Sequence, residues 1–254
     1  MISKFIKIFV SKSLSMQTKQ LHNWNLPYSE AISLQKKLAE KIKHIKIKNQ
    51  PKIIAGLDCA FSKDGQKIIA AVVVLKISDF ELIETLHAVK KVTFPYIPGL
   101  LSFREAPVCI AAVEKLRNKP DVFIVDGQGI AHPRRLGLAA HLGLFFDKPT
   151  IGCAKSRLTG KFKEPPLEKG NYSLLKESKS KKGNTSHKSQ TTSDEIIGSV
   201  VRTRTNVKPV FVSVGNKCLL EDAIKITLAC TTKYRLPEPT RLAHQLVSKL
   251  KLHI

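Results

Sequence analysis

Acidic residues are scarce in this chain of 254 residues: 20 Asp and Glu stand against 43 Lys and Arg, which leaves a formal net charge of +23. No apolar run approaches the ~18 residues that a membrane-spanning helix needs. The longest such run, Ile68–Leu75, has the length of a strand. We therefore expect a soluble protein with no membrane partner. Hydrophobic residues still make up 43% of the chain, which excludes a wholly disordered or fibrous protein.

Cysteine is also sparse, and its pattern excludes two kinds of small scaffold. The five cysteines are odd in number and widely scattered, at Cys59, Cys109, Cys153, Cys218 and Cys230. They include no CxxC pair, so neither a zinc ribbon nor a disulfide framework is indicated. A reducing, intracellular compartment fits this pattern, and we expect a cytoplasmic protein with no obligate protein partner.

The excess of positive charge indicates the kind of partner. It raises self-repulsion and stabilises nothing internally, so we expect it to face a polyanion. A general bias toward lysine could account for about 10 of these charges. A pI near 9.9 is nevertheless typical of nucleic-acid-binding proteins, in which Lys and Arg gain affinity by releasing counterions from the phosphate backbone.

Two segments differ in composition from the rest. Residues 1–24 contain no acid and no continuous apolar core of a signal peptide, so we predict a basic, flexible N-terminal extension. Residues 25–254 then form the main domain. Within it, residues 176–193 are mostly Lys, Ser, Thr, Asn and Gln, which bury too little apolar area to offset the entropy of ordering. We predict a mobile, low-complexity insertion there.

The main domain starts with a helical pattern at 31–44 and continues as three strands. Residues 52–61 and 67–77 are joined by the turn Lys63-Asp64-Gly65, and residues 82–94 follow. Short links between consecutive strands indicate an antiparallel meander.

Strands and helices then alternate along the chain. Helices are predicted at 107–117, with Pro107 in the first turn, and at 133–144, 219–230 and 240–252, and strands at 121–126, 149–154, 198–203 and 210–214. Such alternation favours parallel strands. The predicted class is therefore α/β, with a mixed sheet in which an antiparallel meander is followed by parallel strands, flanked by helices.

Three acids stand where a metal ion could be held. Asp58 interrupts an apolar strand, where a carboxylate is costly unless a positive charge balances it. Asp126 follows an apolar strand, at the sheet edge where parallel strands hold ligands. Together they can share Mg²⁺, which prefers carboxylate and water oxygens, and Glu105 could complete the set.

Each acid also has a structural interpretation. Asp126-Gly127 is an ordinary turn dipeptide. Ser102 and Glu105 have the spacing of a helix capping box, and Asp58 could lie on a solvated strand face. Spacing alone does not decide between these interpretations.

The sequence around the acids is more specific. Six segments resemble, in order, motifs of the endonuclease V family: PYIPG at 95–99, FRE at 103–105, VDGQGIAHPRR at 125–135, GCAKSRLTG at 152–160, RTR at 202–204 and LPEPTR at 236–241. The resemblance extends from about residue 31 to about residue 250, apart from the insertion.

The resemblance implies a fold and a reaction. Members of this family have a ribonuclease H-like fold and are Mg²⁺-dependent endonucleases that act on deaminated bases, chiefly inosine, in DNA repair. They cleave the second phosphodiester bond 3′ to the lesion and leave the base in place. We expect Mn²⁺ to substitute for Mg²⁺ and DNA with deaminated bases to be the partner. An inosine-specific endoribonuclease and a catalytically weakened binding protein stay open as alternatives. A junction resolvase or transposase would share the fold but does not explain residues 95–98.

The resemblance also assigns roles by position. Asp58, Glu105 and Asp126 correspond to the metal-binding acids, and His132 and Lys155 to active-site residues. Whether one or two ions bind is not decided.

Substrate contacts follow from the same resemblance. Residues 95–98 correspond to a wedge that turns the base out of the stack, and residues 127–129 to the pocket that receives it; without the family, 95–98 would be a proline-rich turn. The residues concerned are Pro95, Tyr96, Ile97, Pro98, Gly127, Gln128 and Gly129.

Two residues depart from the family pattern. Asn216 stands where the family often has a histidine near the metal, and we expect weaker activity or a shifted metal preference, because an amide lacks the charge and proton chemistry of imidazole. His244 stands where the family often has aspartate, and we give this less weight.

Overall fold

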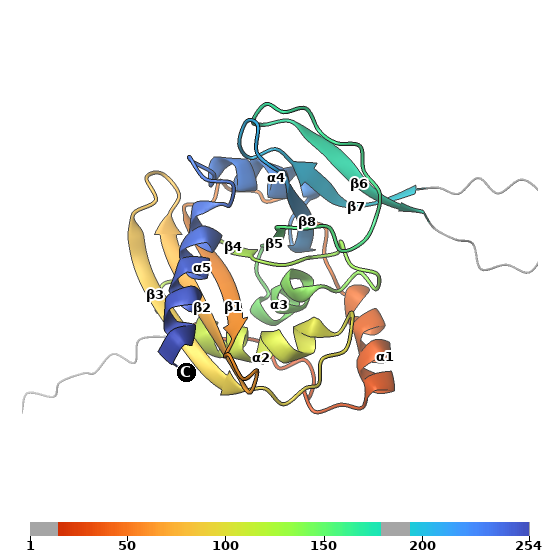
Figure 1. The fold of residues 1–254 in the computed structure, drawn as a ribbon, viewed down its shortest axis with the longest axis vertical. Coiled ribbons are helices and arrows are strands. Elements are labelled where there is room, and N and C mark those ends of the chain that lie inside the picture. Colours follow the sequence, from red (N-terminus) through yellow and green to blue (C-terminus); the bar gives the residue numbers. More distant parts are fainter. Residues whose placement is uncertain (1–14, 179–193, 254) are drawn as a thin grey trace, which may run out of the picture.

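Eight strands of the described chain form one sheet through the middle of the molecule (Figure 1). The computed structural model describes residues 15–178 and 194–253, so most of the predicted insertion lies outside the described residues. The strands are β1 (Ile53–Phe61), β2 (Lys67–Lys76), β3 (Leu82–Lys91), β4 (Val122–Val125), β5 (Thr150–Ala154), β6 (Tyr172–Ser178), β7 (Asp194–Val201) and β8 (Val210–Asn216). Their order across the sheet is β3-β2-β1-β4-β5-β8-β7-β6.

The strand directions confirm the predicted mixed sheet. β1, β2 and β3 form an antiparallel meander, and Gly65 in the first turn has a φ of +71°, which favours glycine. β4 is parallel to β1, and β5 is parallel to β4. β8, β7 and β6 then continue the sheet with antiparallel pairing. The sequence does not predict β6. Among the described side chains of this strand, only Leu175 is buried.

Helices cover both faces of the sheet (Figure 1). They are α1 (Tyr28–Ala39), α2 (Leu101–Val113), α3 (Leu138–Phe146), α4 (Leu220–Ala229) and α5 (Glu238–Leu250), which a short 3₁₀ helix (Lys251–His253) follows. On one face, Leu57 and Val72 share a core with α2 and α3. On the other face, Ile54 and Val212 share a core with α4 and α5. Burial of alternate strand residues on opposite faces thus holds the three layers together.

α2 begins earlier than the sequence predicts. It starts at Leu101, so Pro107 lies inside the helix and not in its first turn. Phe103, Ala106 and Ile110 keep helical spacing through the proline and are all buried. Their burial offsets the backbone hydrogen bond that a proline cannot donate.

α3 begins later than predicted. It starts at Leu138, whereas the sequence suggested Pro133. Arg135 has a φ of +59°, a left-handed conformation that a right-handed helix cannot contain.

α1 ends at Ala39, several residues before the predicted end at His44. The following backbone bonds to the end of β8. The Lys43 N–H donates to Asn216 Oδ1 over 3.0 Å, and the Lys43 carbonyl accepts from the Lys217 N–H over 2.7 Å. These bonds replace the hydrogen bonds of a further helical turn.

The last residues of the predicted N-terminal extension contact the rest of the described chain. Met16 is buried, and its N–H donates to the Leu116 carbonyl over 2.9 Å. The Lys19 N–H donates to the Phe145 carbonyl over 2.8 Å, and Trp24 stacks on the Phe145 ring. Residues 15–24 therefore pack on the domain, because their few apolar side chains cover α3; residues 1–14 lie outside the described residues.

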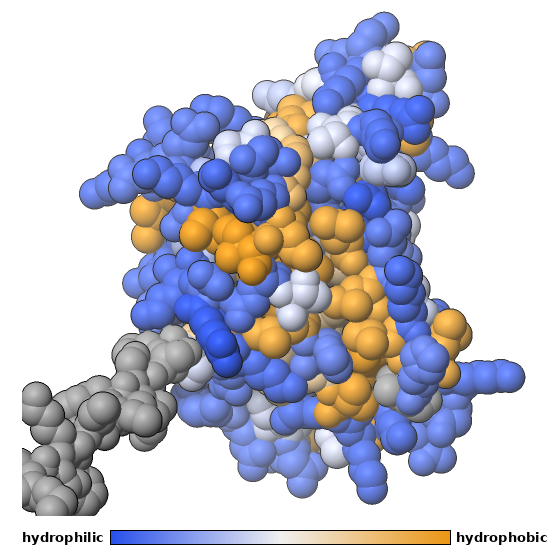
Figure 2. Space-filling view, turned by 90° about the vertical axis from the view of Figure 1, so that its left-hand side faces the viewer, coloured by the Kyte–Doolittle hydropathy of each residue, from blue (hydrophilic) through white to orange (hydrophobic). Residues whose placement is uncertain are grey.

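No helix in the described ranges is long and apolar enough to cross a bilayer. β3 forms one edge of the sheet, on the side of the molecule that Figure 2 shows, where hydrophilic residues surround patches of apolar ones. β3 exposes Leu82 and Val89 together with Lys90 and Lys91. Lysines on an edge strand disfavour pairing with another sheet.

Candidate active site

Three predicted site residues lie where neighbouring strands end. Asp58 is in the second half of β1, Asp126 directly follows β4, and Lys155 directly follows β5. Because β1, β4 and β5 are parallel neighbours, their carboxyl ends meet at one edge of the sheet. The Asp126 N–H donates to the Leu57 carbonyl over 2.9 Å, so strand pairing holds this acid beside Asp58.

Asp58, Asp126 and His244 form a compact group in which one ligand atom of each lies within 4.8 Å of the others. His244 Nδ1 lies 2.7 Å from Asp58 Oδ2. Lys155 Nζ lies 2.5 Å from Asp126 Oδ2 and 3.3 Å from His244 Nδ1. The carboxylate inside the strand thus has a histidine as hydrogen-bond partner, and the lysine ammonium supplies positive charge nearby.

The Asp58 carboxyl is unusually hard to ionise. Its side chain is buried, and burial together with the charge of Asp126 raises its pKa, although His244 and Lys155 act in the opposite direction. Negative charge is therefore concentrated at this edge of the sheet.

His244 reaches the site because α5 lies very close to β1. A Cβ at Gly56 would lie 2.0 Å from the Pro239 carbonyl carbon, so glycine alone permits this approach. Pro239 is in the first turn of α5, and His244 follows within the same helix. In the sequence, the PEPTR motif marks the segment that carries His244. It does not show which residue of α5 faces Asp58.

Glu105 lies on α2, half-buried, and lines a pocket together with Asp126. It is the fifth residue of α2, and no side-chain cap forms there, so the capping box is excluded. Burial and the carboxylates of Asp58 and Asp126 raise the pKa of Glu105 to about 8. Burial is the larger cause and the two carboxylates add to it, so a divalent cation beside them would favour the ionised form of Glu105.

The donor set fits a hard divalent cation. Carboxylate oxygens are the ligands that Mg²⁺ and Mn²⁺ prefer, and the imidazole of His244 is compatible with Mn²⁺ as well. The group therefore makes a possible metal centre, while the donor types alone leave the identity of the ion open.

A pocket of about 460 Å³ opens beside the acids. The sequence-predicted residues that line it are Tyr96, Ile97, Pro98, Glu105, Asp126, Gly127, Gln128, His132 and Lys155. Pro95 and Gly129 are not among its lining residues. The structure thus gathers the tip of the predicted wedge, most of the predicted lesion pocket and two of the acids around one cavity, with Tyr96 69% exposed.

The loop after Asp126 combines tight packing with a free acceptor. A Cβ on Gly129 would lie 2.0 Å from the Val214 carbonyl oxygen, so the fold itself requires glycine there. Gln128 Nε2 donates to the Ser156 carbonyl over 2.9 Å. Gln128 Oε1 is buried and finds no hydrogen-bond partner among the described residues. A base in the pocket could donate to that oxygen.

The end of the wedge loop is held by two side chains that the sequence does not single out. Gln35 Nε2 donates to the Gly99 carbonyl over 3.0 Å, and Arg134 Nη2 donates to the same oxygen over 2.7 Å. Gln35 is fully buried and also donates to the Leu136 carbonyl over 2.9 Å. These bonds tie the predicted wedge to the loop that precedes α3. The sequence does not indicate this role for Gln35, because a glutamine on an amphipathic helix suggests a solvated face.

His132 and Lys155 differ in their surroundings. Burial and the nearby Arg134 lower the pKa of His132 to about 4, so its ring is neutral at neutral pH. The Arg134 N–H donates to His132 Nδ1 over 3.1 Å. Arg235 Nη2 donates to the Lys155 carbonyl over 2.6 Å, which fixes the backbone that carries the ammonium group.

Asn216 lies away from the acids. β8 is antiparallel to β5, so Asn216 pairs with Thr150 at the start of β5, whereas Lys155 follows its end. The Asn216 side chain is buried, and its Nδ2 donates to the Gly143 carbonyl over 2.9 Å. The expectation that this position lies near the metal site is therefore wrong for this chain. The departure from the family pattern that does lie in the site is His244.

Comparison with known proteins agrees with this geometry. The sequence profile described as Endonuclease V matches residues 36–245. The Endonuclease V of Methanothrix thermoacetophila is 45% identical over 236 residues, which cover 93% of this chain and 97% of that protein. The crystal structure of the Bacillus subtilis Endonuclease V has a TM-score of 0.82 at 31% identity, covering 94% of this chain and 98% of that one.

A further solved structure contains nucleic acid. Endonuclease V of Ciona intestinalis, in complex with a 24mer DNA containing an inosine followed by a ribo-adenosine, has a TM-score of 0.70 at 28% identity. The match covers 89% of this chain and 98% of that one. The chain therefore belongs to the endonuclease V family, whose members are nucleases.

Proposed function

We propose that the protein is a Mg²⁺-dependent endonuclease that hydrolyses the second phosphodiester bond 3′ to a deoxyinosine in DNA. The observation that supports this is the position of Asp58 and Asp126 beside a pocket that also holds Tyr96 and Gln128. The Ciona intestinalis protein in complex with inosine-containing DNA supports a deaminated base as the target.

Asp58, Asp126 and His244 would hold the metal ion, and the carboxyl of Glu105 lies in the same pocket as Asp126. When bound, Mg²⁺ lowers the pKa of water and offsets negative charge on the phosphate. Hydrolysis joins a water oxygen to phosphorus and breaks the bond from phosphorus to the 3′ oxygen. The products are a 3′-hydroxyl and a 5′-phosphate.

Two further residues would act on the phosphate and its protons. The ammonium of Lys155 lies 2.5 Å from Asp126 Oδ2, so it brings positive charge to the edge where the phosphate would bind. His132 is neutral at neutral pH, because burial lowers its pKa to about 4, and a neutral ring can accept a proton or donate a hydrogen bond.

Recognition would begin with the wedge at residues 95–98. Turning a base out of the stack costs a few kcal/mol, which an exposed aromatic side chain can offset by filling the gap. Tyr96 and Ile97 lie at the pocket and suit that role. Hypoxanthine carries an N1–H donor that adenine lacks, and the unpartnered Gln128 Oε1 is an acceptor of the matching kind.

The test is incubation of the protein and Mg²⁺ with an end-labelled duplex containing one deoxyinosine, followed by mapping of the nick. We expect a cut one nucleotide beyond the lesion, none in the matched deoxyadenosine duplex, and none by Asp58→Asn or Asp126→Asn. Cleavage that survives both substitutions would refute the metal site.

A matched strand with riboinosine in place of deoxyinosine tests the first alternative, an inosine-specific endoribonuclease. Cleavage of riboinosine but not of deoxyinosine would make the protein an endoribonuclease. Binding to both strands with no cleavage in Mg²⁺ or Mn²⁺ would make it a binding protein.

A further inference from the structure

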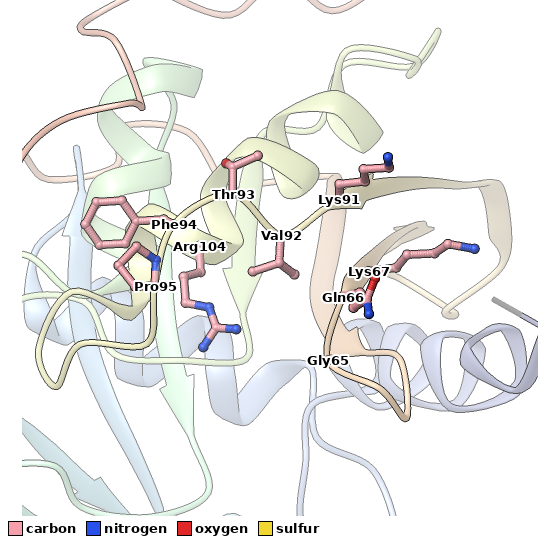
Figure 3. A pocket seen from close by; sticks show the side chains of 9 residues that line it. All are labelled: Gly65, Gln66, Lys67, Lys91, Val92, Thr93, Phe94, Pro95 and Arg104. Atoms are coloured by element: carbon pink, nitrogen blue, oxygen red, sulfur yellow. The ribbon is translucent and has the colours of Figure 1, made fainter.

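A second, shallow pocket of about 480 Å³ lies beside the active-site pocket. Figure 3 shows the side chains that line it. It is lined by Gly65, Gln66, Lys67, Lys91, Val92, Thr93, Phe94, Pro95 and Arg104. Pro95 and Arg104 line this pocket, whereas the residue after each, Tyr96 and Glu105, lines the active-site pocket. The two cavities are therefore neighbours on either side of the segment that carries the wedge.

The charged side chains that line this second pocket are all cationic. Lys67 and Lys91 are exposed and directly opposite each other across β2 and β3, an arrangement of like charges that destabilises a sheet. Neither forms an ion pair with a carboxylate among the described residues. Asp64, in the turn between β1 and β2, accepts hydrogen bonds from Ser62 and from the Gln66 N–H, and Lys67 adds to these in lowering its pKa. The unfavourable pairing of the two lysines is relieved if an anion binds there.

Arg104 is oriented by aromatic rings. Its guanidinium lies 4.6 Å from the Phe61 ring centroid and 5.8 Å from that of Tyr96. Its Nε is buried and has no hydrogen-bond partner among the described residues. Stacking on aromatic faces holds the group in place, and no hydrogen bond within the described residues occupies its terminal N–H groups.

We propose that this pocket is a second phosphate subsite, which binds the nucleic-acid backbone beyond the wedge. The inference rests on the proposed function, since it takes a polynucleotide as the ligand. It adds a binding site that is distinct from the metal group and from the base pocket.

The layout of the cations favours a polynucleotide over a single small anion. Lys67 and Lys91 extend to one side of Val92, and the Arg104 guanidinium lies to its other side (Figure 3). The charges are thus spread along a track and do not converge on one point. A nucleic-acid strand carries one phosphate per about 3.4 Å of helix axis, so it presents charges in series to such a track.

The test is binding of a fluorescent duplex with a central deoxyinosine, measured without divalent ions over a range of salt concentrations. We compare the wild type with Lys67→Ala/Lys91→Ala. A lysine that contacts phosphate contributes about 1 to the salt slope, so we expect a slope less steep by about 2 and roughly tenfold weaker binding. With a duplex truncated close to the lesion on the wedge side, the wild type and the variant should bind equally.

The matched control is Lys36→Ala/Lys37→Ala, which removes the same charge from two exposed lysines of α1 outside the pocket. A control with the same loss of slope as the pocket variant would overturn the proposal, as would a pocket variant with the wild-type slope. Thermal melting confirms that each variant folds.

Two further measurements complete the test. One distinguishes a backbone subsite from a site for free phosphate, and the other separates failure of the subsite from failure of the proposed function. Titration with inorganic phosphate should give no saturable heat; tight phosphate binding lost in the pocket variant would overturn the backbone subsite and indicate a site for free phosphate. The salt slope can also be measured on undamaged duplex. If the protein shows no preference for inosine, the proposed function is refuted. The salt slopes of the two variants on undamaged duplex then still test the subsite.

Discussion

His244 Nδ1 lies 2.7 Å from Asp58 Oδ2, although 186 positions separate the two residues in the chain. The contact joins α5 to β1 and sets the imidazole against the buried carboxyl of Asp58. His244 is therefore positioned both to hydrogen-bond to Asp58 and to offer a third ligand atom to a metal ion.

Replacing His244 by alanine should lower the rate of metal-dependent cleavage. Loss of one ligand or of its supporting partner costs about 10–100-fold in metal affinity or activity. His244→Asp restores a carboxylate ligand, so it should recover cleavage better in Mg²⁺ than in Mn²⁺. The measurement is the single-turnover nicking rate against metal concentration, and a His244→Ala protein as active as the wild type would contradict the ligand role.

Asn216→Ala should destabilise the protein without disabling it. The buried amide donates to the Gly143 carbonyl and accepts from the Lys43 N–H, so its removal leaves the buried Gly143 carbonyl without this partner. The expected cost is about 1–3 kcal/mol in the free energy of unfolding. The measurements are urea unfolding and nicking per folded molecule, and a selective loss of nicking at unchanged stability would argue against the structural role.

Tyr96→Ala should lower nicking at deoxyinosine while leaving stability within about 0.5 kcal/mol of the wild type. The side chain is 69% exposed, so it contributes little to the core. Its expected role is to fill the gap that an extruded base leaves. Tyr28→Ala, at an exposed tyrosine on α1, is the matched control, and equal nicking by the two variants would exclude the wedge role.

Stability should fall in mild acid through a pair of histidines, of which His141 is fully buried and His22 half-buried. His141 Nε2 lies 2.8 Å from His22 Nε2, and His141 Nδ1 lies 3.0 Å from Ser102 Oγ. Burial lowers the pKa of both histidines below the usual 6.5. Below about pH 6.5 the unfolded chain therefore binds more protons than the folded one, so this contribution is complete near pH 7.5 and declines as the pH falls.

The measurement is the melting temperature at pH 7.5 and pH 5.5 for the wild type and His141→Phe. We expect a smaller difference between the two pH values in the variant, because phenylalanine cannot take up a proton. The raised pKa of Glu105 acts in the opposite sense in both proteins and cancels in the comparison. An equal pH dependence in the two proteins would show that the histidine pair does not set it.

The parts of the fold that the sequence predicts are those with local signals. Alternating and continuous apolar runs predict β1 to β5, β7 and β8 within a few residues, since burial determines both pattern and structure. α2 was misplaced because Pro107 is a strong local signal, which the packing of Phe103 and Ile110 outweighs. β6 could not be predicted, because an edge strand with few buried side chains has no distinctive pattern.

The candidate site shows the same division. Asp58 and Asp126 could be singled out because an acid inside or at the end of an apolar strand is unusual. His244 and Gln35 could not, because their contacts depend on how α5 and α1 lie against distant segments. The position of Asn216 was predicted wrongly because it depends on the strand direction. β8 runs antiparallel to β5, so its last residue lies at the opposite end of the strands from Lys155.

The close approach of Pro239 to Gly56 has a consequence for synthesis of the chain. The strand that carries Asp58 leaves the ribosome long before the helix that carries His244. A polypeptide interrupted within that interval contains both aspartates and lacks the imidazole, so the three-residue group cannot assemble. The group of Asp58, Asp126 and His244 is thus completed only after translation has passed residue 244.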